Sequence, residues 1–84
     1  MTVIEIKREM LAHIGKCVHE RRKELGISEE ELAWRVQISN CQLRNIEKGI
    51  ANPKADTLVP LCDELSVTIE DIYAPYAEEV REYV

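Results

Sequence analysis

The sequence predicts an all-α fold of five short helices, with room for an additional helix at the C-terminus. Three observations predict it: apolar residues recur at three- and four-residue spacing, a serine or threonine precedes several of these stretches, and glycines follow two of them. Because 84 residues suffice for only one hydrophobic core, we expect a single domain over residues 1–84.

The first helix is predicted over roughly residues 7–25. Its apolar face is formed by residues three or four positions apart, namely Ile6, Met10, Ile14, Cys17, Val18 and Leu25. Gly26 follows this stretch, and we expect it to end the helix in a left-handed conformation. The segment 3–6 is also compatible with a short N-terminal strand.

Two short helices separated by a tight turn are predicted next. Ser28 is expected to cap the first of them, with Glu31 three residues later completing a capping box. Ser39 is expected to cap the second, with Gln42 in the reciprocal position, and Gly49 ends it. This helix-turn-helix arrangement allows the second helix to stand out from a small domain.

A fourth helix is predicted after the loop marked by Asn52-Pro53. Its apolar residues run from Ala55 to Leu65, on one broad side of the helix. Pro60 interrupts this pattern because an interior proline removes one hydrogen bond. We therefore expect the helix either to begin later than Ala55 or to be kinked.

The C-terminal residues predict one short helix and an extension. Thr68, with Asp71 three residues later, is expected to cap the fifth helix. Pro75 allows a further helix over about 75–84. The apolar stripe of that extension contains Tyr76, Ala77, Val80, Tyr83 and Val84, and we interpret it as core or as a dimer seam.

Composition and charge restrict the classes of protein. No apolar run approaches the roughly 20 residues that span a bilayer, and the N-terminus lacks the apolar stretch of a signal peptide. Cys17, Cys41 and Cys62 are widely spaced and odd in number, which indicates free thiols in the cytoplasm. The net charge is -5, yet residues 1–60 carry +1 and residues 61–84 carry -6. The acidic excess therefore lies away from the two-helix segment.

The side chains that carry catalysis or bind metals are not grouped in any familiar pattern. His13 and Cys17 stand four residues apart on the first helix, but no further pair has zinc-like spacing. No glycine-rich phosphate loop and no arrangement typical of a nucleophile with its base is present. We therefore expect a protein that is not an enzyme and that holds neither a metal nor a cofactor.

From about Ile14 to Tyr73 the sequence resembles the Cro/phage-repressor (XRE-like) type of helix-turn-helix domain. The resemblance is carried, in order, by Ile14-Gly15, Arg22, Gly26-Ile27-Ser28, Glu30-Glu31-Leu32-Ala33, Ile38-Ser39, Ile46-Glu47-Lys48-Gly49, Asn52-Pro53, Leu58, Leu61 and Leu65-Ser66-Val67. It implies a lambda-repressor-like five-helix DNA-binding domain with a motif core at about 14–73.

The resemblance also implies roles for individual residues. The helix that opens at Ser39 would be the recognition helix, which enters the major groove. The positions that face base edges correspond to Asn40, Cys41, Gln42, Arg44 and Asn45. The positions that face phosphates correspond to Ser28, Glu29, Ser39, Lys48, Asn52 and Lys54. The residue types suit base readout, since Asn and Gln bond adenine and Arg bonds guanine, although a solvated polar face remains the alternative.

Four further residues follow from, or depart from, the family pattern. Arg22 and Glu47 correspond to a buried ion pair that joins the first helix to the recognition helix. Glu29 replaces the usual Gln, and its carboxylate would repel a phosphate by about 1 kcal/mol. Gln37 replaces the usual Gly of the turn, where a left-handed backbone costs other residues about 1 kcal/mol.

The sequence thus predicts a sequence-specific transcriptional regulator that binds double-stranded DNA as a homodimer. The alternative is a protein-interaction module, either antitoxin-like or a degenerate helix-turn-helix, with weak or no DNA binding. Trp34 lies off the apolar stripe of its helix and should be partly exposed. It would serve the alternative as a partner surface, together with the C-terminal helix, unless it lies across a neighbouring helix edge.

Overall fold

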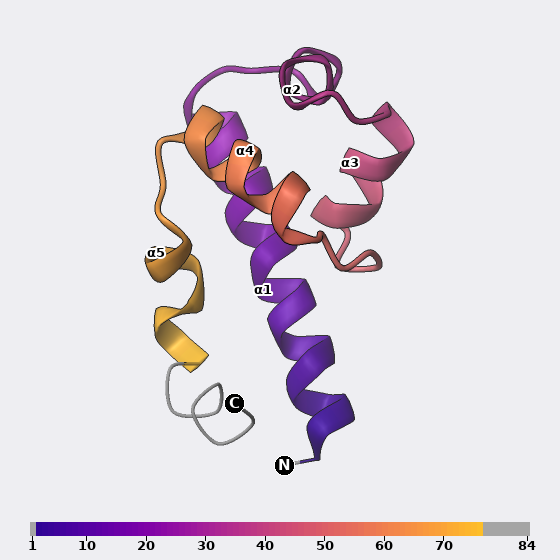
Figure 1. The fold of residues 1–84 in the computed structure, drawn as a ribbon, viewed down its shortest axis with the longest axis vertical. Helices are drawn as coiled ribbons and strands as arrows, with labels where there is room; N and C mark the ends of the chain where they lie inside the picture. Colours follow the sequence, from indigo (N-terminus) through magenta and orange to yellow (C-terminus); the bar gives the residue numbers. More distant parts are fainter. Residues whose placement is uncertain (1, 77–84) are drawn as a thin grey trace.

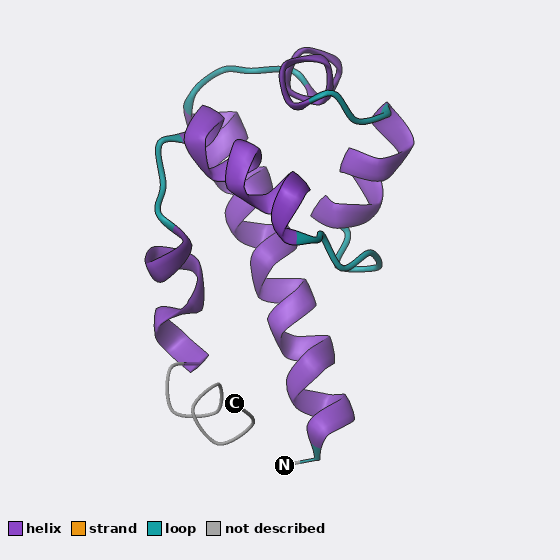
Figure 2. Ribbon diagram, viewed as in Figure 1, coloured by secondary structure: helices purple, strands orange, loops and turns teal. Residues whose placement is uncertain are grey.

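The computed structural model describes residues 2–76, which are helical and contain no strand (Figures 1 and 2). The helices are α1 (Val3–Glu24), α2 (Glu29–Val36), α3 (Asn40–Glu47), α4 (Ala55–Leu65) and α5 (Ile69–Tyr73), followed by a 3-10 turn η1 (Ala74–Tyr76). The predicted all-α, lambda-repressor-like five-helix fold is confirmed. Most of the predicted C-terminal helix over 75–84 lies outside the described residues.

The long helix α1 is the central element of the molecule (Figure 1). Helices α3, α4 and α5 all pack against it, while α2 packs against α3 and α4. In Figure 1 α2 and α3 lie at the end away from the N-terminus, and α5 runs beside the N-terminal half of α1. Within residues 2–76 no helix is both long enough and apolar enough to cross a membrane.

Helix α1 begins earlier than predicted, at Val3 rather than near residue 7. The cause is a capping box: the Thr2 hydroxyl accepts from the Glu5 N–H, and the Glu5 carboxylate accepts from the Thr2 N–H. The alternative of a strand over 3–6 is therefore wrong. Leu25, predicted in the core, is 40% exposed because it is the C-cap residue, beyond the last helical turn. Gly26 has φ +68°, which confirms the left-handed end.

The turn between α2 and α3 follows the predicted chemistry with one correction. The Ser28 hydroxyl caps α2, but Glu31 does not complete the box because its carboxylate pairs with Arg35 at 3.0 Å. Ser39 and Gln42 do form a complete box at the start of α3. Gln37 adopts φ 60° and ψ 45°, the left-handed conformation expected for this position.

Helix α4 begins at Ala55 and contains Pro60, so the predicted later start is wrong. Pro60 is the sixth residue of the helix and removes one backbone hydrogen bond. Leu58, Leu61 and Cys62 are buried around it, and their packing offsets that loss. The capping box of α5, from Thr68 and Asp71, is present as predicted.

The hydrophobic core packs α3 directly against α1. It is formed by apolar side chains of all five helices: Ile14, Val18, Leu32, Ala33, Val36, Leu43, Ile46, Leu58, Leu61, Cys62, Leu65 and Ile72. A Cβ atom on Gly15 would lie 2.6 Å from the Glu47 carbonyl oxygen, so only glycine permits this approach. A Cβ atom on Gly49, at φ +75°, would lie 2.9 Å from the Ala12 Cα atom. The backbones of α1 and of the end of α3 therefore touch.

Candidate nucleic-acid interface

The amphipathic pattern of α3 gives it a buried face, which packs on the core, and an exposed outward face. Leu43 and Ile46 are buried, at 0% and 3% exposure, because they point into the core. The opposite face carries all five residues predicted to face base edges: Asn40, Cys41, Gln42 and Arg44 are exposed, and Asn45 is half-buried. The structure thus brings the predicted base-facing residues together on one side of one helix.

The amide side chains on this face differ in their freedom to bond a base. The Gln42 Oε1 atom accepts from the Ser39 N–H at 2.9 Å, so its acceptor is engaged in the capping box. The Asn45 Nδ2 group donates to the Cys41 Sγ atom at 3.8 Å. The Asn40 side chain makes no hydrogen bond with the described part of the chain, which leaves its donor and acceptor open.

The residues predicted to face phosphates lie at helix starts and in the loop after α3. Ser28 and Ser39 cap α2 and α3, and each hydroxyl retains a hydrogen to donate. Lys48, Asn52 and Lys54 are exposed. Lys54 is the N-cap residue of α4, and no side chain caps that helix, so its first N–H groups are available to an anion. All of these groups except Glu29 can attract or donate to a phosphate.

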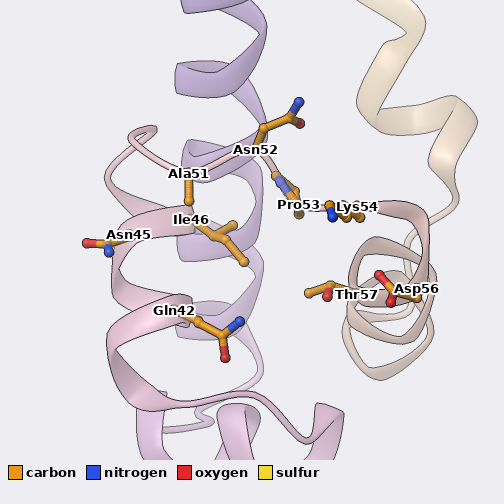
Figure 3. Close-up of a pocket in the computed structure, with 9 residues that line it drawn as sticks. All are labelled: Gln42, Asn45, Ile46, Ala51, Asn52, Pro53, Lys54, Asp56 and Thr57. Carbon is orange, nitrogen blue, oxygen red and sulfur yellow. The ribbon is translucent and has the colours of Figure 1, made fainter.

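An open hollow lies between α3 and the start of α4. Its volume is about 350 Å³. Figure 3 shows Gln42 of α3 and Thr57 of α4 pointing toward one another across it. The other lining residues are Asn45, Ile46, Ala51, Asn52, Pro53, Lys54 and Asp56. The hollow therefore places two predicted base-facing residues, Gln42 and Asn45, beside two predicted phosphate-facing residues, Asn52 and Lys54.

Arg22 and Glu47 form a buried ion pair beneath this surface. The Arg22 Nε atom lies 3.1 Å from Glu47 Oε2, and Nη2 lies 3.1 Å from Oε1. Their side chains are only 7% and 5% exposed. The Arg22 Nη1 group also donates to the Ile27 carbonyl at 2.9 Å. Arg22 thus ties α1, the loop before α2, and α3 together, and it is unavailable to DNA.

Three polar contacts here were missed from the sequence. His19 Nδ1 lies 2.6 Å from Glu47 Oε1. The sequence did indicate this contact, because His19 stands three residues before Arg22 on the same face of the helix. The Glu29 carboxylate pairs with Arg44 at 3.5 Å and with Arg22 at 3.9 Å. These pairs result from the angle between helices, which no local spacing reveals.

The thiols form no metal site with the described residues. His13 and Cys17 do meet, with Sγ 3.5 Å from Nε2, but within residues 2–76 no three His, Cys, Asp or Glu side chains gather to hold a metal. Burial raises the pKa of the Cys17 and Cys62 thiols, and the charges of Glu20 and Asp63 add to this. Cys41 is exposed on α3.

Comparison with solved structures places this fold among bacterial regulators. The clp gene regulator ClgR of Corynebacterium glutamicum superposes with a TM-score of 0.74 at 20% identity, covering 88% of this chain and 79% of that one. A mutant of the restriction-modification controller protein C.Esp1396I superposes with a TM-score of 0.68 at 19% identity, covering 89% and 95%. These similarities concern the fold.

Sequence comparison identifies the family. Uncharacterized HTH-type transcriptional regulators from two strains of Mycobacterium tuberculosis are 32% identical over 59 residues, which is 70% of this chain. The chain spans 42% of the length of those relatives. The helix-turn-helix family HTH_3 matches residues 18–72, which include α2, the turn and α3. The chain therefore belongs to the helix-turn-helix family HTH_3.

Proposed function

We propose that this protein is a sequence-specific DNA-binding regulator that inserts α3 into the major groove. The main support for the proposal is that the apolar face of α3 is buried in the core while its polar face is exposed. A helix held in this way presents its side chains to base edges at a fixed depth. The names of the relatives, which are transcriptional regulators, support the same role.

The groups around α3 supply the two kinds of contact that such binding needs. Asn40 and Arg44 are exposed on α3 and suit adenine and guanine respectively. Gln42 can join them by releasing the Ser39 N–H. Lys54 and the open start of α4 border the hollow beside α3, and Lys48 is exposed at the end of α3, so these groups can hold the phosphates of one strand. These contacts set the register in which the bases are read.

The remaining parts of the proposal follow the family. The protein would act in the cytoplasm as a homodimer on a palindromic site, with neither cofactor nor enzymatic activity. The C-terminal helices would supply the dimer contact. A dimer places two copies of α3 one helical turn of DNA apart, so half-sites should repeat at about 10 base pairs.

Fluorescence anisotropy tests the proposal directly. The protein is titrated with a random duplex and with the duplex upstream of its own gene, each at two salt concentrations. We expect tighter binding to the upstream duplex and weaker binding to both at higher salt. Absence of binding to either duplex at micromolar protein and low salt would contradict the proposal.

Variants separate base readout from phosphate contact. Alanine at Gln42, Arg44 or Asn45 should reduce the preference for the upstream duplex. Alanine at Lys48 should weaken binding to both duplexes alike and lower the salt slope by about one. Unchanged preference in all three α3 variants would show that these residues do not read the bases.

Trp34 supports a second candidate role, a protein-interaction surface. Its side chain is 76% exposed on α2, although it is the largest apolar side chain of the described residues. Exposed tryptophans are frequent anchors of interfaces. Light scattering of the wild type and of Trp34→Ala tests the role: a lower molar mass for the variant would assign Trp34 to self-association, and equal masses would remove that assignment.

A further inference from the structure

We propose that Glu29 determines specificity by positioning Arg44 to read a guanine. The inference rests on the proposed function and names one base that the interface selects. Glu29 is the first residue of α2, and its side chain is 35% exposed. Its Oε2 atom lies 3.5 Å from Arg44 Nε, across the turn that separates the two helices. The carboxylate therefore acts on Arg44 from outside α3.

The other side of the same carboxylate faces an immobile cation. Glu29 Oε1 lies 3.9 Å from Nη2 of Arg22. Arg22 is itself fixed, because its donors are engaged by the Glu47 carboxylate and the Ile27 carbonyl in a buried site. Glu47, Arg22, Glu29 and Arg44 thus form a series of alternating charges from the core to the outward face of α3. The buried end of this series limits the positions that Glu29 can take.

This arrangement prepares Arg44 for one base. A carboxylate beside Nε leaves the two Nη groups of the guanidinium available, and neither of them makes a hydrogen bond or ion pair with the described residues. Guanine offers O6 and N7 as a matching pair of acceptors in the major groove. An exposed arginine that is already held on one side loses less side-chain freedom when it binds.

The same pairs change the expected electrostatic effect of Glu29. A bare carboxylate at this position would repel the phosphate backbone. Here its charge faces two arginines, one of which lies in the interface. Glu30, the next residue, is exposed and makes no ion pair with the described part of the chain. Glu30 is therefore a matched control with the same charge on the same helix.

The experiment measures guanine preference rather than affinity alone. A randomised duplex library is first used to select the preferred site of the wild-type protein. The dissociation constant is then measured for that site and for the same site with each guanine in turn replaced by adenine. We expect Arg44→Ala to abolish the preference at one guanine, a preference of about 5- to 150-fold if it comes from one bidentate contact.

Glu29 variants give the decisive comparison at that guanine. Glu29→Met removes both the charge and the acceptor oxygens, and it should lower the preference at least about threefold. Glu29→Gln keeps an acceptor oxygen and should give an intermediate value. Glu30→Met should retain the wild-type preference. Glu29→Met should cause no further loss of preference when Arg44 is already alanine, because the two residues act as one unit.

The possible failures are distinguishable. If the wild type selects no sequence, the proposed function fails and this inference fails with it. If the wild type selects a site but Arg44→Ala changes no guanine, or Glu29→Met discriminates as well as the wild type, the inference alone is overturned. Thermal unfolding of each variant establishes that the fold is intact, which is expected since Glu29 is partly exposed at a helix start.

Discussion

Replacing Glu47 by glutamine should destabilise the fold severely. The substitution keeps the shape of the side chain but leaves the Arg22 charge in a site where that residue is 6% exposed. Three Arg22–Glu47 donor–acceptor contacts, at 3.1 to 3.3 Å, then lose a charged acceptor. Breaking one side of a buried pair costs about 3–5 kcal/mol.

This loss is large for a chain of this size. At about 0.05–0.15 kcal/mol per residue, 84 residues give a total stability of roughly 4–13 kcal/mol. For small domains each kcal/mol lowers Tm by about 4–8 °C, so Glu47→Gln should lower Tm by roughly 12–40 °C. Urea unfolding followed by circular dichroism measures the free energy directly.

A double variant separates the buried charge from lost packing. Arg22→Met combined with Glu47→Leu removes both charges and should recover most of the stability that Glu47→Gln loses. A loss below about 1 kcal/mol for Glu47→Gln, or a double variant no more stable than the single one, would refute the reasoning. The first result would mean that the pair is hydrated, and the second that shape rather than charge dominates.

Four further predictions concern stability and thiol chemistry. Gly15→Ala should lower the free energy of unfolding in urea by about 1–3 kcal/mol, because the added Cβ would meet the Glu47 carbonyl. Gly26→Ala has open space around it and should cost only the left-handed backbone strain, about 1 kcal/mol. Equal losses for the two variants would contradict this reasoning. Gln37→Gly should raise Tm by a few degrees, since φ is 60° there, and a lower Tm would show that the side chain contributes more than the strain costs. With iodoacetamide at pH 8, mass spectrometry should find Cys41 modified first and Cys62 last, because Cys62 is buried and burial raises its pKa. Because burial raises the pKa of Cys62, the folded state favours its neutral thiol and gains stability from it. This gain is complete below pH 9.0 and is lost as the pH rises through the raised pKa of the folded state. Urea unfolding at pH 8 and at pH 10 measures the difference.

The parts of the fold that local chemistry determines were predictable from the sequence. Ser39 with Gln42, and Thr68 with Asp71, fix helix starts through bonds within one turn, so the sequence alone locates them. The buried positions of α3 follow from its 3.6-residue period. The capping pair of Thr2 and Glu5 lies before the predicted start of the first helix near residue 7, in a segment that was also compatible with a short strand. Glu31 was misassigned because Arg35, four residues later, competes for its carboxylate.

The features that depend on the angle between helices were not predictable. The approach of Glu29 to Arg44 joins residues 15 positions apart on two helices, and no periodicity encodes it. The hollow beside Gln42 depends likewise on how the loop after α3 returns to α4. Pro60 shows the opposite case: local propensity favoured a helix that begins later than Ala55 or is kinked, yet the helix begins at Ala55 and buried neighbours surround the proline. The roles of the residues on the outward face of α3 stay predictions until DNA binding is measured.

The backbone contact at Gly15 affects which substitutions this protein can accept during evolution. Helix α3 is held by its own carbonyl groups and by Leu43 and Ile46, none of which faces outward. Asn40, Cys41 and Arg44 can therefore be exchanged without disturbing the packing of α3 on the core, whereas Gln42 also completes the capping box of this helix. Under the proposed function, new operator preferences can arise by a few substitutions on the exposed face of α3 while Gly15 stays fixed.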